Sequence, residues 1–573
     1  MNQTRTVTPA TSVQRRWWKE CVVYQVYPRS FMDSNGDGIG DLPGITARLD
    51  YLQWLGVDVI WLCPVFRSPN DDNGYDVSDY RAIMDEFGSM ADFDALLAAV
   101  HARGMKLIVD LVLNHCSDEH PWFIEARAAR TSAKRDWFLW RDGREGGPPN
   151  NWESIFGGPA WKLDEGSGQY FLHIFSARQP DFNWEHAALR AALFDIVRWW
   201  LDKGVDGFRL DALSHLKKAP GLPDLPNPQG LSCVPSYAGH MNVDGVLEHV
   251  DRLCAQFAGR DVMTVGEANG VGPAQALEWV GAEHGRLSML FQFEHLALWS
   301  PERPGALDLR ALKKVLSAWQ RVLHGRGWNA LFIENHDVTR ALSRWGDEER
   351  RRDSATALAA LYFLMEGTPF IYQGQEIGMA NSRFERIDDF RDVASLNAYA
   401  LGRAAGEDEA ALIARLAGTS RDNARTPMQW DASAQAGFST ATPWIGVNPD
   451  YRAINVAAQR DDPDSVLSFY RRLIALRRAE PVLQYGRYRL LMADDARIYA
   501  YGRSAGRDSI VVMVNMSRGE AQFRHRGIRL RHAGLLLANR PVAAHADCDA
   551  VRLQAFEARV YRLGRRVRPA SPA

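Results

Sequence analysis

Four apolar stretches of this 573-residue chain each end in residues that can carry charge. They are KLIVDLVLNH, VDGFRLD, DVMTVGE and NALFIENHD, and they end at His115, Asp211, Glu267 and Asp337. Each stretch is rich in Val, Ile, Leu and Phe, which is typical of a strand buried on both faces in a parallel sheet. One carboxylate in such a place is as often a helix cap as a functional group. Four independent coincidences are far less expected, so we interpret these residues as one group.

Carboxylates brought together from separate strands can act as nucleophile, general acid and general base. In a (β/α)8 barrel the C-terminal ends of the strands form one face, and active sites are built there. Arg209 lies two residues before Asp211 and so on the same face of its strand, where its charge would keep that carboxylate ionised. We therefore expect a catalytic cluster at the C-terminal face of such a barrel.

The order of the remaining elements fits that barrel. CVVYQVYPRSF and VDVIWLCP predict the first two strands, and ITARLDYLQWLG predicts the helix between them. Helices are expected at MADFDALLAAVHARG and LRAALFDIVRWWLDKG, and the sixth and eighth strands at SMLFQFEH and GTPFIYQGQEIG. Alternating strands and helices are typical of a parallel sheet covered by helices. We predict the α/β class, with a (β/α)8 TIM barrel as the catalytic domain.

Two stretches interrupt this alternation. Residues 116–186 are rich in Trp, Gly, Pro and Asn, lack periodicity and are too long for a simple loop, so they predict an inserted subdomain B after the third strand. A second irregular insertion is expected at about residues 380–430. The last ninety or so residues alternate between turn signals, which predicts a C-terminal antiparallel β domain. The expected parts are a tail (1–16), the barrel (17–115 and 187–482), subdomain B (116–186) and the β domain (483–573).

Composition excludes several classes of partner. The 68 basic and 70 acidic side chains leave a formal charge of −2. The sequence therefore lacks the excess of positive charge that is typical of proteins that bind nucleic acid or an anionic membrane surface. The six cysteines are scattered and form no CxxC pair, so a disulfide framework or a zinc site is not expected. The N-terminus lacks the apolar core of a secretory signal, and no run approaches a membrane span. We expect a cytoplasmic protein, unless a signal was removed from this chain.

The motifs resemble those of a known family. DLVLNH, GFRLD, VGE and ENHD, in this order and on strands three, four, five and seven, resemble the four signature regions of the α-amylase superfamily of retaining glycoside hydrolases. QPDFN, with Phe182 where the signature has Leu, is similar to the signature of the oligo-1,6-glucosidase subfamily. DNGYDVSDY and SRDNARTPMQWD also resemble this subfamily, which contains α-glucosidases, dextran glucosidase, trehalose-6-phosphate hydrolase and sucrose isomerases.

The resemblance implies a role for each acid. Asp211 would be the nucleophile, Glu267 would be the acid and later the base, and Asp337 would grip sugar hydroxyls and stabilise the oxocarbenium-like transition state. Both carboxyl groups are needed for retaining hydrolysis, one ionised and one protonated. The remaining substrate contacts implied by the resemblance are Tyr75 by stacking, Asp76, His115 and His336 by hydrogen bonds, and Arg421, which would close the pocket with Asp76, with Arg425 as a weaker candidate.

A closed pocket of this kind accepts one glucose at a chain end, so exo-action on short oligosaccharides is expected. Ala212 follows the nucleophile, and relatives with Val at this position act on α-1,6 bonds, so the resemblance implies a preference for maltose-like α-1,4 bonds. The alternatives are an oligo-1,6-glucosidase, a trehalose-6-phosphate hydrolase, and a sucrose isomerase or transglucosylase. Residues 295–309 lack the RLDRD loop of sucrose isomerases, which favours hydrolysis. A different class is a non-catalytic relative, such as a transporter heavy chain. Such a relative would have a membrane anchor, whereas this sequence contains no membrane span and has all three acids. The sequence leaves the oligomeric state open.

DSNGDGIGD is a separate signal for a metal. Asp33, Asn35, Asp37, the Ile39 carbonyl and Asp41 follow the spacing of the first nine positions of an EF-hand loop. Gly44 stands where the acidic twelfth ligand would be, so from spacing alone a turn that binds nothing is an equal alternative. The resemblance favours a structural Ca²⁺ remote from catalysis. No organic cofactor is expected.

Overall fold

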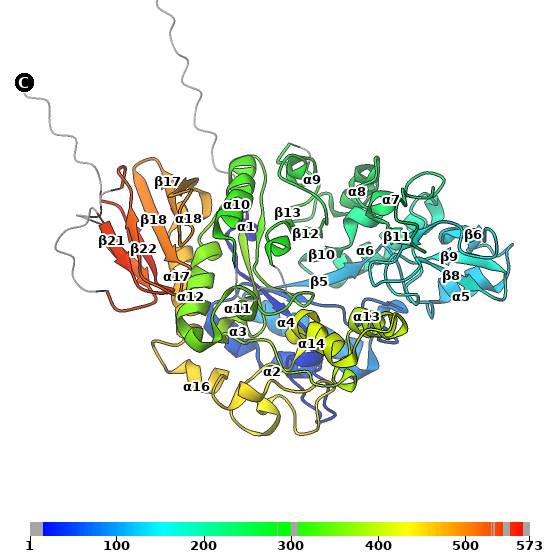
Figure 1. The fold of residues 1–573 in the computed structure, drawn as a ribbon, viewed down its shortest axis with the longest axis horizontal. Helices are drawn as coiled ribbons and strands as arrows, with labels where there is room; N and C mark the ends of the chain where they lie inside the picture. The colour runs from blue at the N-terminus through cyan, green and yellow to red at the C-terminus, as the bar shows by residue number, and fades with distance from the viewer. Residues whose placement is uncertain are drawn as a thin grey trace, which may run out of the picture.

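In the computed structural model, eight parallel strands form the centre of the molecule (Figure 1). Their order in the sheet is β13, β12, β10, β5, β2, β1, β15 and β14. A parallel bridge between Leu290 of β13 and Asn329, which directly precedes β14, joins the two edges and closes the barrel. The predicted (β/α)8 barrel is confirmed. The strands are β1 (Val23–Val26), β2 (Val59–Leu62), β5 (Lys106–Val112), β10 (Gly207–Asp211), β12 (Met263–Glu267), β13 (Met289–Phe291), β14 (Ala330–Leu331) and β15 (Thr368–Tyr372).

The structure describes residues 15–283, 285–299, 307–528, 530, 533–542 and 550–564. Residues 1–14 of the predicted tail, Cys548, and residues 300–306 of the stretch compared with sucrose isomerases lie outside the described residues. The five described cysteines are all free thiols.

The barrel strands are buried on both faces, as their continuous apolar character predicts. Val23 and Val59 lie opposite each other in β1 and β2 and belong to the cluster that fills the barrel interior. Tyr24 and Ile60, one residue further along each strand, point the other way and pack in the large core between the sheet and the helices. Both side-chain positions of a strand are therefore used for packing, which leaves function to the strand ends.

Helices cover the outside of the barrel, and those predicted at MADFDALLAAVHARG and LRAALFDIVRWWLDKG are confirmed. α4 begins with a capping box at Ser89, and α6 ends at Gly204 in the left-handed conformation, which glycine adopts without strain. The predicted first helix is divided at Arg48 into α2 (Leu42–Ala47) and α3 (Leu49–Leu55). The other main helices are α4 (Met90–Ala102), α6 (Ala187–Lys203), α8 (Val246–Cys254), α10 (Leu309–Leu323), α12 (Arg351–Phe363) and α17 (Val466–Ala479).

Subdomain B contains helix α5 (Pro121–Ala128) and a small antiparallel sheet of β6 (Trp140–Asp142), β9 (Gln169–Leu172) and β8 (Trp161–Asp164). Its Trp-rich composition has a packing reason, since Trp152 and Trp161 are core residues here. β7 (Trp152–Glu153) pairs in parallel with β11 (Val234–Pro235), which belongs to the loop after β10. A segment outside residues 116–186 thus completes the subdomain, which composition does not reveal.

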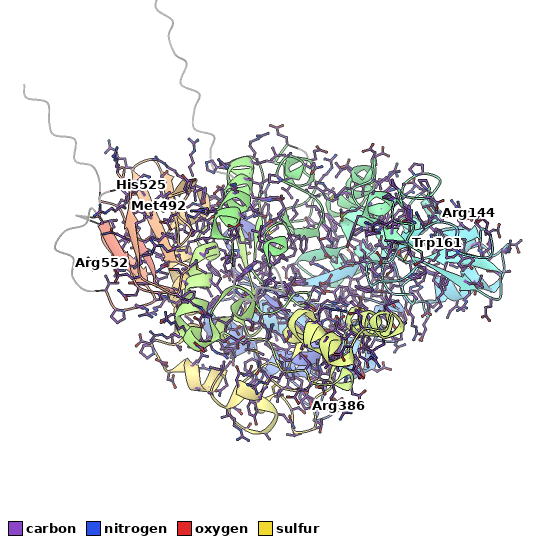
Figure 2. All side chains as sticks on the ribbon, in the orientation of Figure 1. Arg144, Trp161, Arg386, Met492, His525 and Arg552 are labelled. Carbon is purple, nitrogen blue, oxygen red and sulfur yellow. The ribbon has the colours of Figure 1, made fainter. Side chains whose placement is uncertain are left out.

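The C-terminal region folds as the predicted antiparallel sheet. Its strands, in sheet order, are β16 (Arg487–Leu491), β17 (Ile498–Ala505), β18 (Asp508–Asn515), β22 (Ala558–Arg562) and β20 (Gly534–Ala538), with β19 (Ala521–Arg524) and β21 (Ala550–Leu553) as a separate pair. Figure 2 shows Met492, His525 and Arg552 of this region at one end of the molecule, and Arg144 and Trp161 of subdomain B at the other. The barrel lies between them.

The second insertion is more regular than its sequence suggests. It contains α13 (Val393–Ala404) and α14 (Glu409–Thr419), which pack against each other as a helical hairpin. Few of their residues are buried, among them Ser395, Gly402, Leu412 and Leu416, so the apolar periodicity that marks a helix is weak. Among the described residues, no helix is long and apolar enough to cross a membrane.

Candidate active site

Two carboxylates lie at the C-terminal ends of neighbouring strands. Asp211 is the last residue of β10, and Glu267 is the last residue of β12. These strands pair in parallel with Leu210 opposite Gly266, so the next residue of each strand reaches the same face of the barrel. The structure therefore brings together the two acids that the sequence predicts as a catalytic pair.

The Arg209 guanidinium holds both carboxylates. Its Nη1 atom lies 2.5 Å from Asp211 Oδ1, and its Nη2 atom lies 2.5 Å from Glu267 Oε2. Nη1 also donates to Oδ1 of Asp110, a fully buried residue of β5, at 2.8 Å. One buried cation thus binds carboxylates from three adjacent strands, which fixes their positions relative to one another.

Three carboxylates around one guanidinium favour the uptake of a proton. Burial, followed by the charges of Glu267 and Asp110 and a hydrogen bond to Glu267, raises the pKa of Asp211 well above its usual value, although Arg209 opposes this shift. The structure differs here from the expectation that Arg209 keeps Asp211 ionised, because Arg209 is shared. A raised pKa means that Asp211 takes up a proton more readily than an isolated aspartate does.

The third acid, Asp337, is held by cations. The predicted seventh strand is shorter than expected, since β14 ends at Leu331 and the chain to Asp337 is irregular. The Asp337 Oδ1 atom lies 3.2 Å from Arg421 Nη1 and 3.3 Å from Arg425 Nη2, and Oδ2 lies 3.0 Å from His336 Nε2. Burial alone would raise the pKa of Asp337, but His336, Arg421 and Arg425 hold it well below its usual value. Asp337 is therefore ionised.

The predicted aromatic and histidine contacts form a layer beside these acids. The rings of Tyr75 and His336 stack with centroids 5.2 Å apart, and the Tyr75 hydroxyl donates to Asp110 Oδ2 at 2.9 Å. His336 Nδ1 lies 2.7 Å from the Gln25 amide nitrogen, which makes Nδ1 the acceptor and directs the Nε2 proton towards Asp337. His115 is buried with Nε2 3.2 Å from the Tyr75 carbonyl, and burial lowers its pKa to about 4, so it is neutral.

One predicted contact is wrong. The Asp76 side chain is fully buried, and its two oxygens accept the backbone N–H groups of Asp71 and Asp72 at 2.8 and 3.0 Å. Arg421 instead binds Asp72, with Nη2 2.9 Å from Oδ1. The predicted closure of the pocket by Arg421 and Asp76 is therefore replaced by a pair of Arg421 and Asp72. Burial raises the pKa of Asp76 to about 7, as expected for a carboxyl group without a cation.

Sequence reasoning missed Asp72 because DDNGYD offers three acidic residues within six positions, and only the folded turn selects one. Sequence reasoning also did not predict what the QPDFN segment contacts. Gln179 Nε2 lies 3.2 Å from Asp72 Oδ2, so subdomain B supports the residue that Arg421 binds. The buried Lys218 amine lies 2.5 Å from Asp181 Oδ2 and 2.9 Å from Asn114 Oδ1. This contact ties subdomain B to the end of β5 and to the loop that follows Asp211.

Ala212 lies next to the acid pair in a strained conformation. Its φ of 49° and ψ of 33° are left-handed, a conformation that costs a non-glycine residue about 1–2 kcal/mol. This turn directs the Ala212 N–H to Glu267 Oε2, at 3.3 Å. The residue after Asp211 thus helps to orient the second acid through its backbone.

The predicted metal loop has oxygen donors of the type that Ca²⁺ uses. Asp33 already accepts the backbone N–H groups of Asn35, Gly36 and Gly38, while Asp37 accepts that of Ile39 and Asp41 that of Gly44. Among the described residues, no group of three or more His, Cys, Asp or Glu side chains is arranged to hold a metal ion. The carboxylates as placed close the loop on themselves and do not form an oxygen cage. A bound calcium ion stays a prediction.

A large cavity, of about 960 Å³, lies on the opposite side of the barrel, at the N-terminal ends of the strands. It contains none of the residues predicted for catalysis. Its charged walls are largely paired within the protein, since Arg286 binds Asp251 and His324 binds Glu366. The Lys19 amine lies 5.3 Å from the centre of the Trp18 ring and 5.0 Å from that of the Trp328 ring. We place the active site by the side-chain geometry at the C-terminal face.

A closed (β/α)8 barrel that gathers carboxylates from separate strand ends around one buried arginine defines the class of barrel glycoside hydrolases. Residues 25–486 match the family model for the catalytic domain of alpha amylase. The chain belongs to the alpha-amylase family, and the resemblance seen in its motifs is confirmed.

Several relatives are similar over nearly the whole chain. A probable oligo-1,6-glucosidase 3 of Bacillus subtilis (strain 168) is 51% identical, and the match covers 96% of this chain and 100% of the relative. An alpha-glucosidase of Pediococcus pentosaceus is 47% identical, with 96% and 99% covered. The crystal structure of a trehalose-6-phosphate hydrolase of Bacillus licheniformis superposes with a TM-score of 0.90 at 40% identity, over 96% of this chain and 100% of that chain.

We predict that Asp72→Asn impairs glucose binding and that Asp76→Asn impairs stability instead. Asp72→Asn weakens the binding of glucose, used as a probe in calorimetry, by about tenfold or more because Arg421 loses a charged partner. Asp76→Asn leaves that affinity unchanged but destabilises the turn by about 1–3 kcal/mol, since an amide nitrogen then faces a backbone N–H. The reverse pattern would restore Asp76 as the pocket residue.

Removing metal with a chelator should lower the melting temperature if the loop binds Ca²⁺, because an ion bound only by the folded state stabilises by mass action. Asp37→Ala, at an exposed side chain, should abolish this shift and loses one backbone contact, from Ile39, whereas Asp33→Ala loses three backbone hydrogen bonds of the loop. Thermal unfolding with and without chelator, together with elemental analysis, checks this. An equal melting temperature and no metal would show that the loop binds nothing.

Proposed function

We propose that this protein is a retaining, exo-acting α-glucosidase that releases glucose from the non-reducing end of short α-glucosides. The observation that carries the proposal is the pairing of Asp211 and Glu267 on one Arg209 guanidinium, with each oxygen 2.5 Å from its nitrogen. Relatives named oligo-1,6-glucosidase and alpha-glucosidase, up to 51% identical, support this substrate class. The partner is a small oligosaccharide.

In the proposed reaction Asp211 attacks the anomeric carbon while Glu267 gives its proton to the leaving oxygen. The glycosidic bond breaks and a glucosyl ester forms on Asp211. Glu267 then takes a proton from water, the water oxygen attacks the same carbon, and the ester bond breaks. Arg209 would stabilise the Asp211 carboxylate when it leaves the anomeric carbon. Another sugar in place of water would give transglucosylation.

The proposed pocket for one glucose is closed by charged residues. His336, Arg421 and Arg425 hold the pKa of Asp337 well below its usual value, so its carboxylate would accept hydrogen bonds from sugar hydroxyls and offset the positive charge of the transition state. The Asp72–Arg421 pair would cap the far end, because protein contacts hold both side chains in place. Tyr75, His115 and His336 line this end in the proposal.

The proposal also includes a preference for one type of glycosidic linkage. We favour maltose-like α-1,4 bonds because Ala212 removes bulk beside Glu267, where the sugar on the leaving side would lie. A second candidate is an oligo-1,6-glucosidase, since two relatives with that name are 51% and 48% identical to this chain. Trehalose-6-phosphate hydrolysis is a third reading, supported by the likeness to a solved hydrolase of that name.

Asp211→Asn should lower turnover of maltose or of a nitrophenyl α-glucoside by several orders of magnitude, because the amide cannot form the ester. Its size is conserved, so the variant should fold and still bind glucose. A residual rate of more than a few per cent would mean that another residue is the nucleophile. NMR of the fresh wild-type product should show α-glucose, whereas β-glucose would contradict the retaining mechanism.

Ala212→Val should shift the ratio of kcat/KM for isomaltose to that for maltose by roughly 10- to 200-fold towards isomaltose, the range of one hydrophobic contact. A β-branched residue at positive φ is strained, so the melting temperature should also fall. Ala212→Gly is the matched control, because it relieves strain without adding bulk and should leave the ratio near that of the wild type. Wild-type enzyme that cleaves isomaltose much faster than maltose would contradict the α-1,4 preference.

A further inference from the structure

A buried carboxylate behind Arg421 has no part in the reaction described above. Asp392 lies at the start of α13, in the second insertion, with a side chain only 2% exposed. Its Oδ1 atom accepts two hydrogen bonds from Arg421, at 2.9 Å from Nε and 2.6 Å from Nη2. Asp392 therefore binds the Nε and Nη2 edge of the Arg421 guanidinium with a side chain that is almost fully buried.

The contact with Asp392 fixes the orientation of the Arg421 guanidinium. Nε and Nη2 are directed to Asp392, while Nη1 donates to Asp337 at 3.2 Å and Nη2 also reaches Asp72 at 2.9 Å. The exposed fraction of the side chains falls from 31% for Asp337 to 15% for Arg421 and 2% for Asp392. The three charges thus form a row that runs from the pocket into the protein interior.

Asp392 also balances the charge of a second arginine. Arg425 is fully buried, its Nη1 atom has no hydrogen-bond partner, and that atom lies 3.9 Å from Asp392 Oδ1. Without Asp392, two guanidinium groups would share Asp337 and Asp72, and both would be drawn closer to Asp337. Burial alone would raise the pKa of Asp392, but Arg421 and Arg425 lower it to about 2, so this side chain is an anion at neutral pH.

We propose that Asp392 is a positioning residue for glucose recognition: by holding Arg421 from behind, it keeps the guanidinium between Asp72 and Asp337 and leaves Asp337 free to bind sugar hydroxyls. This inference rests on the proposed α-glucosidase function. It assigns the second insertion a part in substrate binding, because the residue that fixes the cap of the pocket belongs to α13 and not to the barrel.

The test is the kinetics of Asp392→Asn with maltose. Asparagine has the shape of aspartate and can still accept the hydrogen bond from the Ala394 N–H at the start of α13. It lacks the negative charge that holds Arg421. KM, and the inhibition constant of glucose, should rise about tenfold, while kcat changes less than about threefold because the acid pair is untouched. The same substitution in an Arg421→Gln background should add little, since its partner is gone.

Two matched variants separate positioning from general stability. Ser395→Ala removes the hydrogen bond of the Ser395 hydroxyl to Asp392 Oδ2 without touching Oδ1, and Asp388→Asn removes an exposed carboxylate nearby that pairs with Arg386. Both should keep the wild-type KM within about twofold, even where Ser395→Ala lowers the melting temperature. If Asp392→Asn does not fold, Asp392→Glu takes its place, since its longer side chain displaces Arg421 and should raise KM in the same way.

A wild-type KM in the Asp392 variant would overturn the inference, and so would an equal rise in KM for Ser395→Ala. Either result with an active wild-type enzyme leaves the proposed function intact. A wild-type protein that hydrolyses no α-glucoside would overturn the proposed function and this inference together.

Discussion

The contact of Arg209 with three carboxylates is the interaction on which the rest of the site depends. Its guanidinium reaches Asp110, Asp211 and Glu267, which come from three adjacent strands. The parallel register sets these strands side by side, but register alone leaves each side chain free to rotate. A buried ion-pair network of this kind is fixed in geometry because every alternative leaves a charge without a partner. The barrel supplies the positions, and Arg209 supplies the orientation and the charge balance.

Around this centre, two insertions meet at a single residue. The Oδ1 atom of Asp72 binds Arg421, which Asp392 of the second insertion supports, and its Oδ2 atom binds Gln179 of subdomain B. The barrel core therefore carries the chemistry, while parts that lie outside it shape the space for the sugar. Lys218 adds a further link, since it joins subdomain B to the segment directly after Asp211. Changes in either insertion can alter recognition without disturbing the acid pair.

Much of this arrangement could be predicted from sequence. The acids Asp211 and Glu267 could be predicted because apolar runs mark the strands, and a barrel brings the C-terminal ends of its strands to one face. The sequence could not show that Asp72, and not Asp76, binds Arg421, since both residues lie in one turn. Only the folded backbone shows that the Asp76 carboxylate is occupied by two N–H groups. Asp392 lay in a segment without periodicity, so neither its helix nor its burial was visible. The charge state of Asp211 depends on Asp110, which reads in the sequence as an ordinary strand residue.

The closure of the barrel has a consequence for how the protein is made. β1 pairs with β2 on one edge and with β15 on the other, where Val23 lies opposite Phe370, so its second edge finds a partner only when most of the barrel has been synthesised. At about 5–20 residues per second, the free edge of β1 waits roughly 20 to 70 s for β15. An unpaired strand edge is a template for aggregation. The barrel can therefore close only after β15 has been made, and the free edge of β1 can pair with other chains until then.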